Sequence, residues 1–259
     1  MKKFSSLLIV LLFALASFTA SAQSYPRGDV SHDGQVNITD VTVLIDYLLS
    51  GTWPDEPVSP DDHEYVDLGL PSGTLWATCN VGANAPEEYG DYFAWGETEP
   101  KEDYTWETYK WCNGSNDTMT KYCNNSDYGY EGFVDDKTEL DPEDDAAYVN
   151  WGSSWRMPTY SQLIELFDKC TWTWTTQNGV NGRLMTGPNG NTLFMPAAGC
   201  RHDSTLGGAG LVGDYWTRTL GYNYQDGAYM IVMSSEEDWW YSYYRYYGFT
   251  VRPVRVSQE

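Results

Sequence analysis

Side-chain oxygens recur at fixed spacings in one short segment, and this spacing constrains the chain more than any other feature of its sequence. With Asp29 taken as position 1, oxygen-bearing side chains stand at positions 3, 5, 9 and 12, and Gly34 stands at the sharp turn. A loop that holds a hard cation needs this spacing, with a backbone carbonyl at position 7. The alternative is an acidic turn without a metal. We predict one calcium ion, with the ligands Asp29, Ser31, Asp33, Gln35, Asn37 and Asp40.

An apolar stripe follows the loop and predicts a helix that starts near Ile38. The stripe consists of Val41, Leu44, Ile45, Leu48 and Leu49. Loop and helix together resemble one repeat of a dockerin, a module that carries two such repeats and docks proteins onto cohesins. This chain has a single repeat, so its helix cannot bury the stripe against a sister repeat. The stripe is expected to meet the main domain, a second copy of the chain or a cohesin-like partner.

The first 22 residues are typical of an export signal. Lys2 and Lys3 precede an apolar run over residues 7–16, and the small residues 20–22 offer a cleavage site before Gln23. The run is shorter than the roughly 20 apolar residues that a membrane span needs. We therefore expect an exported protein, located in the periplasm, on the cell surface or outside the cell, with no membrane span.

The charge of the chain restricts its partners. The formal net charge is −22 at pH 7, and a field of this sign repels nucleic acid and attracts cations. We expect no nucleic-acid partner.

Five cysteines enter an oxidising compartment if the chain is exported, which allows one or two disulfides and leaves at least one cysteine unpaired within the chain. Cys112 and Cys123 are close in sequence and are the first pair that we expect.

The composition divides the chain into four parts. We expect a signal peptide at 1–22, the calcium loop and helix at 23–50, a Pro-rich acidic linker at 51–63 and one larger domain at 64–259. Within that domain, one helix is predicted over Tyr160–Lys169, and residues 101–151 are expected to form loops. Short strands are expected at 64–70, 75–81, 92–95, 192–195, 228–233 and 249–256. The fold class is α+β.

Several motifs of the larger domain carry a resemblance to a known family. They are the segments 65–77, 92–97, 155–159, 215–217 and 248–255. With them the domain resembles the Fibrobacter succinogenes major paralogous domain family, secreted proteins whose fold is similar to C-type lectins and to the formylglycine-generating-enzyme-like branch. The resemblance implies a C-type-lectin-like domain with few helices, short strands and long loops.

The residues of these motifs are expected to have structural roles rather than catalytic or binding ones. Trp76, Trp95, Trp155 and Trp216 lie in apolar runs and are expected in the core. Arg156 and Arg252 stand beside aromatics and are expected to pair with buried carboxylates.

Enzyme signatures are missing from the sequence. Only three histidines occur, no cysteine follows Cys200, and no nucleophile elbow or zinc helix is present. A glycosidase pair among Glu97, Glu99, Asp135, Asp136, Glu143, Asp144 and Asp145 is the alternative, although acidic runs on polar loops are usually solvated. We expect no enzymatic activity.

Aromatic residues crowd the C-terminal tail. Adjacent pairs such as Tyr243–Tyr244 and Tyr246–Tyr247 cannot all face one core, and tyrosine gives a rigid contact surface at low entropic cost. The matching segment of relatives is the variable region of diversity-generating retroelements, which implies a ligand surface here. The alternative is a Tyr-rich core and edge strand. We predict a surface that binds a protein or a glycan through some of Tyr222, Tyr224, Tyr229, Trp239, Trp240, Tyr241, Tyr243, Tyr244, Tyr246 and Tyr247. A dockerin-type adaptor in a carbohydrate-degrading system is the second hypothesis.

Overall fold

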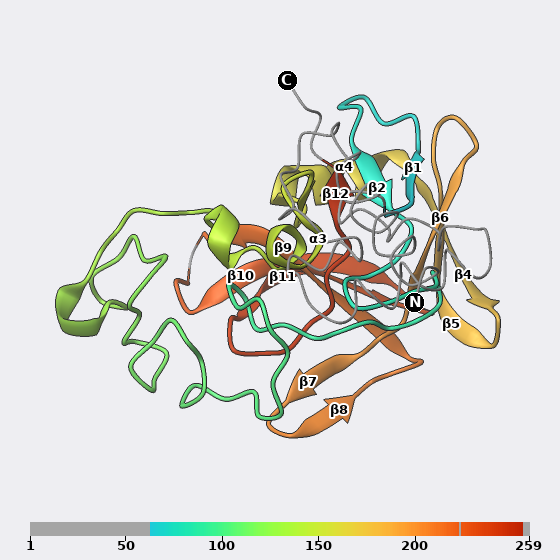
Figure 1. Ribbon diagram of the computed structural model, residues 1–259. Coiled ribbons are helices and arrows are strands. Elements are labelled where there is room, and N and C mark those ends of the chain that lie inside the picture. Colours follow the sequence, from blue (N-terminus) through green and yellow to red (C-terminus); the bar gives the residue numbers. More distant parts are fainter. Residues whose placement is uncertain (1–62, 223, 256–259) are drawn as a thin grey trace, which may run out of the picture. The chain divides into compact units, whose positions relative to one another are not determined.

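The computed structural model describes residues 63–222 and 224–255. By its contacts the chain divides into two units, Met1–Ser59 and Pro60–Glu259, and all described residues belong to the second. The predicted calcium loop, its helix, the signal segment and all but the last residue of the predicted linker lie outside the described residues. The second unit is an α+β fold with few helices, many short strands and long loops, as the sequence predicts (Figure 1).

Two α-helices are described. α4 spans Tyr160–Lys169, the range predicted from the sequence. A capping box fixes its start, because the Thr159 hydroxyl accepts a hydrogen bond from the backbone N–H of Gln162 while the Gln162 side chain accepts from the backbone N–H of Thr159. The shorter α3, Ala146–Trp151, was not predicted. It is followed by β3, and two 3₁₀ turns, η1 (Tyr130–Gly132) and η2 (Pro142–Asp144), precede it.

The strands of the described residues form four separate sheets. The first has the order β1-β2-β12-β3, the second β4-β5-β6, the third β7-β8, and the fourth β11-β10-β9. Their bounds are β1 Tyr65–Asp67, β2 Leu75–Ala77, β3 Trp155–Arg156, β4 Thr171–Gln177, β5 Val180–Thr186, β6 Thr192–Pro196, β7 Cys200–His202, β8 Thr205–Gly207, β9 Val212–Leu220, β10 Gly227–Ser234, β11 Asp238–Tyr244 and β12 Val254–Arg255.

The predicted strands agree with this list in part. Five predicted runs overlap observed strands. β1, β2 and β12 lie within the runs 64–70, 75–81 and 249–256 and are shorter than predicted. β6 and β10 extend slightly beyond the runs 192–195 and 228–233. The run at 92–95 forms only an isolated bridge between Phe93 and Phe249. The β4–β5 hairpin was missed because its alternating Thr and Trp residues were not read as a strand pattern.

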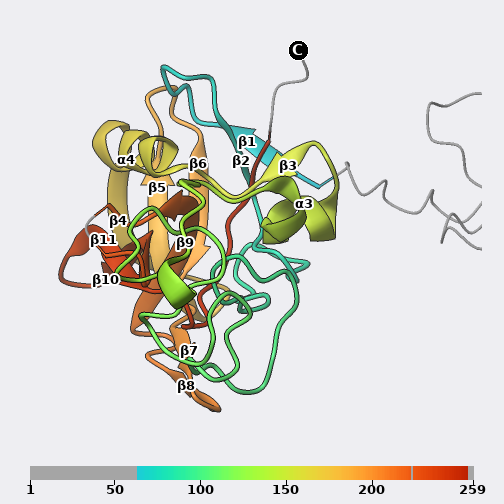
Figure 2. The same cartoon turned by 90° about the vertical axis from the view of Figure 1, so that its left-hand side faces the viewer.

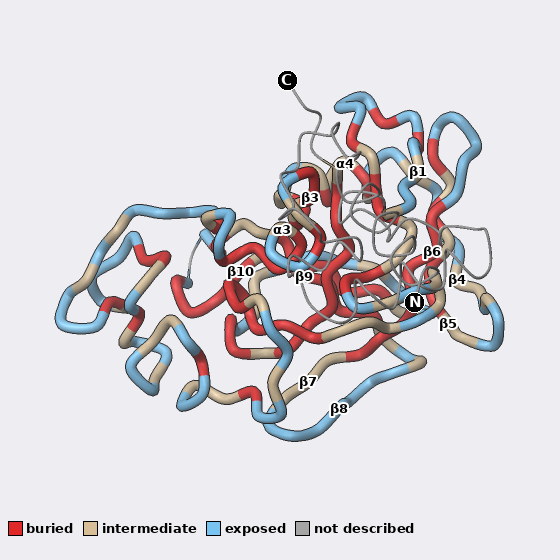
Figure 3. Tube along the Cα trace, viewed as in Figure 1, coloured by how far each residue is buried: buried red, intermediate tan, exposed pale blue. Residues whose placement is uncertain are grey.

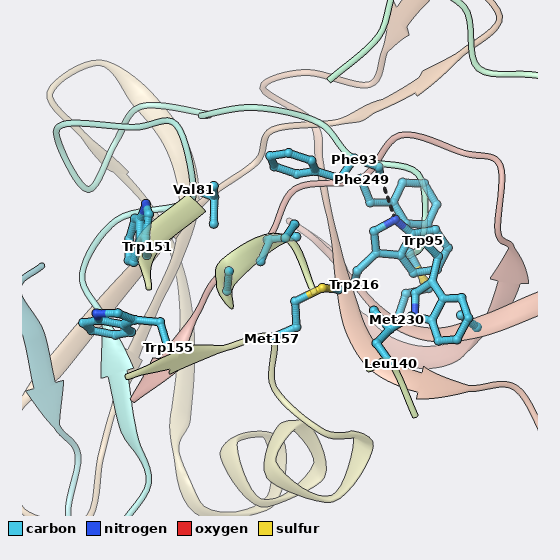
Figure 4. Close-up of a cluster of buried hydrophobic side chains, with 14 of the residues drawn as sticks. Val81, Phe93, Trp95, Leu140, Trp151, Trp155, Met157, Trp216, Met230 and Phe249 are labelled. Carbon is cyan, nitrogen blue, oxygen red and sulfur yellow. Dashed lines mark hydrogen bonds between the residues drawn. The ribbon is translucent and has the colours of Figure 1, made fainter. Parts of the chain in front are cut away.

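The core lies on both faces of the β9–β10 pair. Met230 and Val232 pack on one face with the tryptophans of Figure 4, whereas Ile231 and Met233 pack on the other. Leu163 and Leu166 of α4 and residues of β5 and β6 cover that second face (Figure 2). Figure 3 shows β9 and β10 buried along most of their length.

The four tryptophans predicted as core, Trp76, Trp95, Trp155 and Trp216, are all fully buried. Two of them bind the backbone through their indole N–H groups. Trp216 donates to the Phe93 carbonyl at 2.8 Å (Figure 4), and Trp95 donates to the Thr217 carbonyl at 2.8 Å. These bonds tie the 92–97 motif to β9, so the motifs are scaffold.

The prediction that the two arginines pair with buried carboxylates is wrong for Arg252, whereas the charge of Arg156 interacts with the buried carboxyl group of Asp145. Arg252 is buried, but its guanidinium donates to the carbonyls of Ala77, Thr78 and Phe194 and to the Asn80 side chain. Arg156 donates to two nearby carbonyls and lies over the Tyr148 ring. For Arg252, backbone carbonyls and the Asn80 side chain provide the negative partial charge that a carboxylate was expected to supply.

The prediction of a disulfide between Cys112 and Cys123 is wrong as well. All five cysteines are free thiols in the described residues. Cys112 donates its S–H to the Trp106 carbonyl, and Cys123 donates to the Asn125 carbonyl. Each sulfur is thus held by its own turn, and closeness in sequence did not bring the two together.

Candidate functional site

The C-terminal tail builds the fourth sheet, and its last strand, β11, lies at the edge of that sheet. β11 pairs antiparallel with β10 over its full length, with Trp240 opposite Ile231 and Tyr244 opposite Gly227. No other strand of the described residues pairs with its outer side. Because an edge strand has a neighbour on one side only, its side chains have fewer atoms to pack against than those of β10.

Six of the ten residues predicted to bind ligand are exposed, and we call these six the aromatic surface. Tyr222 and Tyr224 lie between β9 and β10, and the other four lie on β11. Their exposed fractions run from 36% for Tyr241 to 82% for Tyr222. The six residues are Tyr222, Tyr224, Trp239, Trp240, Tyr241 and Tyr244.

Tyr229, Tyr243 and Tyr247 are half-buried, and Tyr246 is buried. Tyr243 and Tyr244 face different sides, as predicted for adjacent tyrosines, because they are successive residues of a strand: Tyr243 packs on the core and Tyr244 is exposed. Tyr246 and Tyr247 do not follow this prediction, because they lie in the turn after β11, where side chains do not alternate, and both pack against a core cluster. Tyr246 joins a core cluster and its hydroxyl is 3.0 Å from Nε2 of His202, so its prediction as an exposed contact is wrong.

A pocket of about 470 Å³ opens beside the aromatic surface, and we call it the tyrosine pocket. This volume lies within the range of roughly 300–1,000 Å³ typical of small-molecule sites. The tail supplies one wall and the loop before η1 supplies the other. Its lining residues are Asn116, Tyr128, Tyr224, Asp226, Gly227, Tyr241, Ser242, Tyr243 and Tyr244.

Among the described residues, Asp226 is the one charged residue that lines the tyrosine pocket, and it is 6% exposed. Its carboxylate accepts a hydrogen bond of 3.0 Å from the Asn116 side chain. The described lysines and arginines form no ion pair with it. Asn116, Tyr128 and Asp226 were not predicted, since an Asn and an Asp in polar loops carry no sequence signal until the fold brings them together.

The two walls of the tyrosine pocket are joined by several contacts. Arg245 is fully buried and donates to the carbonyls of Lys121 and Tyr122 in the opposite loop. The buried Gln225 side chain accepts from the backbone N–H of Asn124 at 3.2 Å. Trp106 contacts the ring of Tyr244 edge-on, with centroids 5.9 Å apart. These contacts fix the loop against the tail, so the pocket is preformed.

A second aromatic group lies at the start of α4. The Tyr160 ring stacks on Tyr229 with a centroid distance of 4.2 Å and meets the edge of Trp240 at 5.1 Å. Trp240 therefore lies on the face of the sheet that α4 covers, opposite the face of its neighbours Trp239 and Tyr241. Burial raises the pKa of Tyr160, with the neighbouring Tyr229 as a second cause.

Desolvation also shifts the pKa values of groups on the β11-β10-β9 sheet and next to it. It raises the pKa of Tyr241 to about 12 and that of Asp214 in β9 to about 7. The thiol of Cys200 lies beside Asp214, and the same desolvation raises its pKa to about 11. Asp214 is thus a buried carboxyl without a cationic partner in the described part of the chain.

The carboxylates considered for a glycosidase pair serve mostly as scaffold where they are buried. Asp145 caps α3 by accepting from the N–H groups of Ala147 and Tyr148, and burial raises its pKa to about 6. Asp144 accepts from the Tyr122 hydroxyl and pairs with Lys121 at 2.6 Å. The expectation that these two acids are solvated is wrong, because each is needed to satisfy buried donors.

The six predicted calcium ligands lie outside the described residues. Their donor set of carboxylates, a hydroxyl, an amide and a carbonyl suits a hard cation. Among residues 63–222 and 224–255, no group of three or more His, Cys, Asp or Glu side chains is arranged to hold a metal ion. No helix in this part of the chain has the length and apolarity to cross a membrane.

Comparison with protein families matches residues 27–68 to the dockerin type I domain. The match covers less than a fifth of the 259 residues and includes all six predicted calcium ligands. It supports a calcium-binding, dockerin-like module in this part of the chain. No curated protein and no solved structure matches the chain. The C-type-lectin-like fold and the relation to retroelement variable proteins therefore stay predictions.

Proposed function

We propose, starting from the dockerin type I match, that this chain is an exported, non-enzymatic adaptor. Its dockerin-like module attaches it to a protein partner of the cohesin type, and the unit from residue 63 onward binds a protein or glycan ligand. Calcium at the module is expected to order the loop and the helix that carries the apolar stripe.

One observation carries the ligand-binding part: the aromatic surface borders the tyrosine pocket on an edge strand. An exposed group of large aromatic side chains marks an interaction site more often than chance exposure does. Tyr224, Tyr241 and Tyr244 belong to both the surface and the pocket. Aromatic anchors beside a pocket are the arrangement from which binding surfaces draw most of their affinity.

The buried acids support a non-enzymatic role. A hydrolytic pair of carboxylates needs both groups free to reach a substrate. Glu97 is buried and bound to Lys101 at 2.9 Å, and Asp144 and Asp145 are buried in the contacts described above.

The ligand-binding part is tested by an array of glycans and of purified proteins, probed with the chain from Gln23 onward. Tyr244→Ala is compared with Tyr65→Ala, which removes an equally exposed ring, 45% in both cases, from β1. We expect the signal of at least one array component to fall about tenfold or more with Tyr244→Ala, as for a central aromatic contact. An array without signal, or equal signals from all three proteins, contradicts the proposal.

The calcium part is tested by titration calorimetry. We expect one calcium ion per chain for the wild type and none for Asp33→Ala, which removes a central ligand. As a control, Asp61→Ala removes an acid of the predicted linker and is expected to keep the site. Equal heats from Asp33→Ala and the wild type contradict the predicted ligand set.

A further inference from the structure

The tyrosine pocket combines one buried carboxylate with several tyrosine rings, and this combination has a chemical preference. Asp226 is more than nine-tenths buried and lines the pocket. Its visible side-chain partner is the neutral amide of Asn116. A buried carboxylate is destabilised by desolvation unless a positive charge or several donors balance it. The described lining offers no positive charge to this carboxylate, so a cationic group that enters the pocket is favoured over a neutral one.

The tyrosines that line the pocket strengthen this preference. Tyr128, Tyr224, Tyr241, Tyr243 and Tyr244 line the same pocket. The face of a tyrosine ring carries negative electrostatic potential and attracts ammonium or guanidinium groups within about 6 Å of its centre. Asp226 also contributes to the raised pKa of Tyr128, after burial as the main cause, which places its charge within electrostatic reach of the opposite wall.

A second pocket in the same unit offers a contrast. It has a volume of about 540 Å³ and is lined by Asp91 and Glu102 together with Lys101 and Arg201. Charges of both signs line that pocket, so it has no preference for one sign. The described residues that line the tyrosine pocket carry a single negative charge and no positive one. The net charge of −22 adds a long-range attraction for cations.

We propose that the tyrosine pocket binds the side chain of a lysine or arginine from a protein partner, with Asp226 as the ion-pair acceptor and the tyrosines as the surrounding cage. This inference rests on the proposed ligand-binding function and specifies the ligand as a protein. The Arg245 and Gln225 contacts hold the pocket open before binding, which reduces the entropy lost when the side chain enters.

The probe is a biotinylated Gly-Ser-Lys-Ser-Gly peptide presented on streptavidin, so that several copies raise the apparent affinity. Matched peptides carry Arg or Gln in place of Lys. The chain from Gln23 onward is expected to bind the Lys or Arg peptide and not the Gln peptide. Asp226→Asn keeps the shape and an acceptor for Asn116 and is expected to weaken binding about tenfold or more. Asp127→Asn removes an exposed acid of the loop before η1, outside the pocket lining, and is expected to change binding less than about twofold.

A ring substitution separates cation binding from general packing. Tyr244→Phe keeps the aromatic face and is expected to retain binding, whereas Tyr244→Leu removes it and is expected to weaken binding. Equal binding of Lys and Gln peptides, or no change with Asp226→Asn in a variant whose melting temperature matches the wild type, overturns the proposal. If glycans but no cationic peptide bind at the aromatic surface, this inference fails and the proposed function stands. If neither binds, both fail.

Discussion

β10 and β11 are neighbouring strands that pair residue for residue, yet they differ in almost every physical respect. β10 is buried on both faces by two core clusters and consists largely of Met, Ile, Val and Ala. β11 consists of Asp, Trp, Tyr and Ser, and four of its aromatic residues are exposed. The pair Ile231 and Trp240 shows the difference within one register position, at 0% and 43% exposure.

The difference indicates that the two strands have separate tasks. A central strand stabilises the fold through buried apolar area, at roughly 25 cal/mol per Å². An edge strand contributes less, and large aromatic side chains there are available for contacts with another molecule. The following predictions test this division, from the largest expected effect to the smallest.

Ile231→Ala is expected to lower the free energy of unfolding by about 2–5 kcal/mol, because it leaves a cavity between β10 and the covering residues of α4. Urea unfolding followed by tryptophan fluorescence measures the change. A loss below about 1 kcal/mol would mean that β10 is not the central strand of a packed core.

Asp214→Asn is expected to change how stability depends on pH. The pKa of Asp214 is raised from 3.8 to about 7 in the folded state, so the folded protein holds a proton that the unfolded chain loses above about pH 4. The stability due to this group is therefore present below pH 4 and is lost as the pH rises toward 7. The Asn variant avoids that loss, which is at most roughly 4 kcal/mol for three pKa units.

The measurement is the difference in unfolding free energy between the variant and the wild type from pH 4 to pH 8. Asp145, with a pKa raised to about 6, gives both proteins a similar slope up to pH 6. The difference is expected to grow in favour of the variant up to about pH 7 and then level off. A difference that does not vary with pH would show that Asp214 is not a buried titrating group.

Tyr246→Phe removes the hydroxyl that meets Nε2 of His202 but keeps the buried ring. We expect a loss of about 1 kcal/mol, the usual net value of a hydrogen bond, and no change in ligand binding. Thermal unfolding and the array measure both quantities. Weakened binding without a loss of stability would show instead that Tyr246 contributes to ligand binding.

Trp240→Ala has the smallest expected effect on stability, about 1 kcal/mol, since the side chain is 43% exposed and lies on an edge strand, where it contacts the edge of the Tyr160 ring. The matched comparison is Ile231→Ala, directly opposite on β10. Similar losses from the two substitutions would remove the distinction between the strands.

Much of the scaffold follows from local sequence signals. Pro158-Thr159 and the helical spacing of Leu163 and Leu166 predict α4, and its predicted bounds agree with the structure. The buried tryptophans follow from their apolar neighbours. α3 was missed because six residues are too few to show a helical period, although Asp145 is a good N-cap.

The tyrosine pocket depends on contacts that no local pattern reports. Asn116 and Asp226 are 110 positions apart and meet only because Arg245 and Gln225 hold the loop against the tail. The aromatic tail was identified from its composition. Which of its residues are exposed depends on the fold, since the turn after β11 buries Tyr246. Sequence therefore predicts which segment carries the surface, and the fold decides which of its residues are available.

The most direct test of the ligand-binding claim measures two quantities on one variant, Tyr244→Ala: the free energy of unfolding and the array signal. The account predicts an unfolding free energy within about 1 kcal/mol of the wild type, because the ring is exposed, together with an array signal reduced about tenfold or more. An unchanged array signal, or a signal lost only because the domain unfolds, would contradict it.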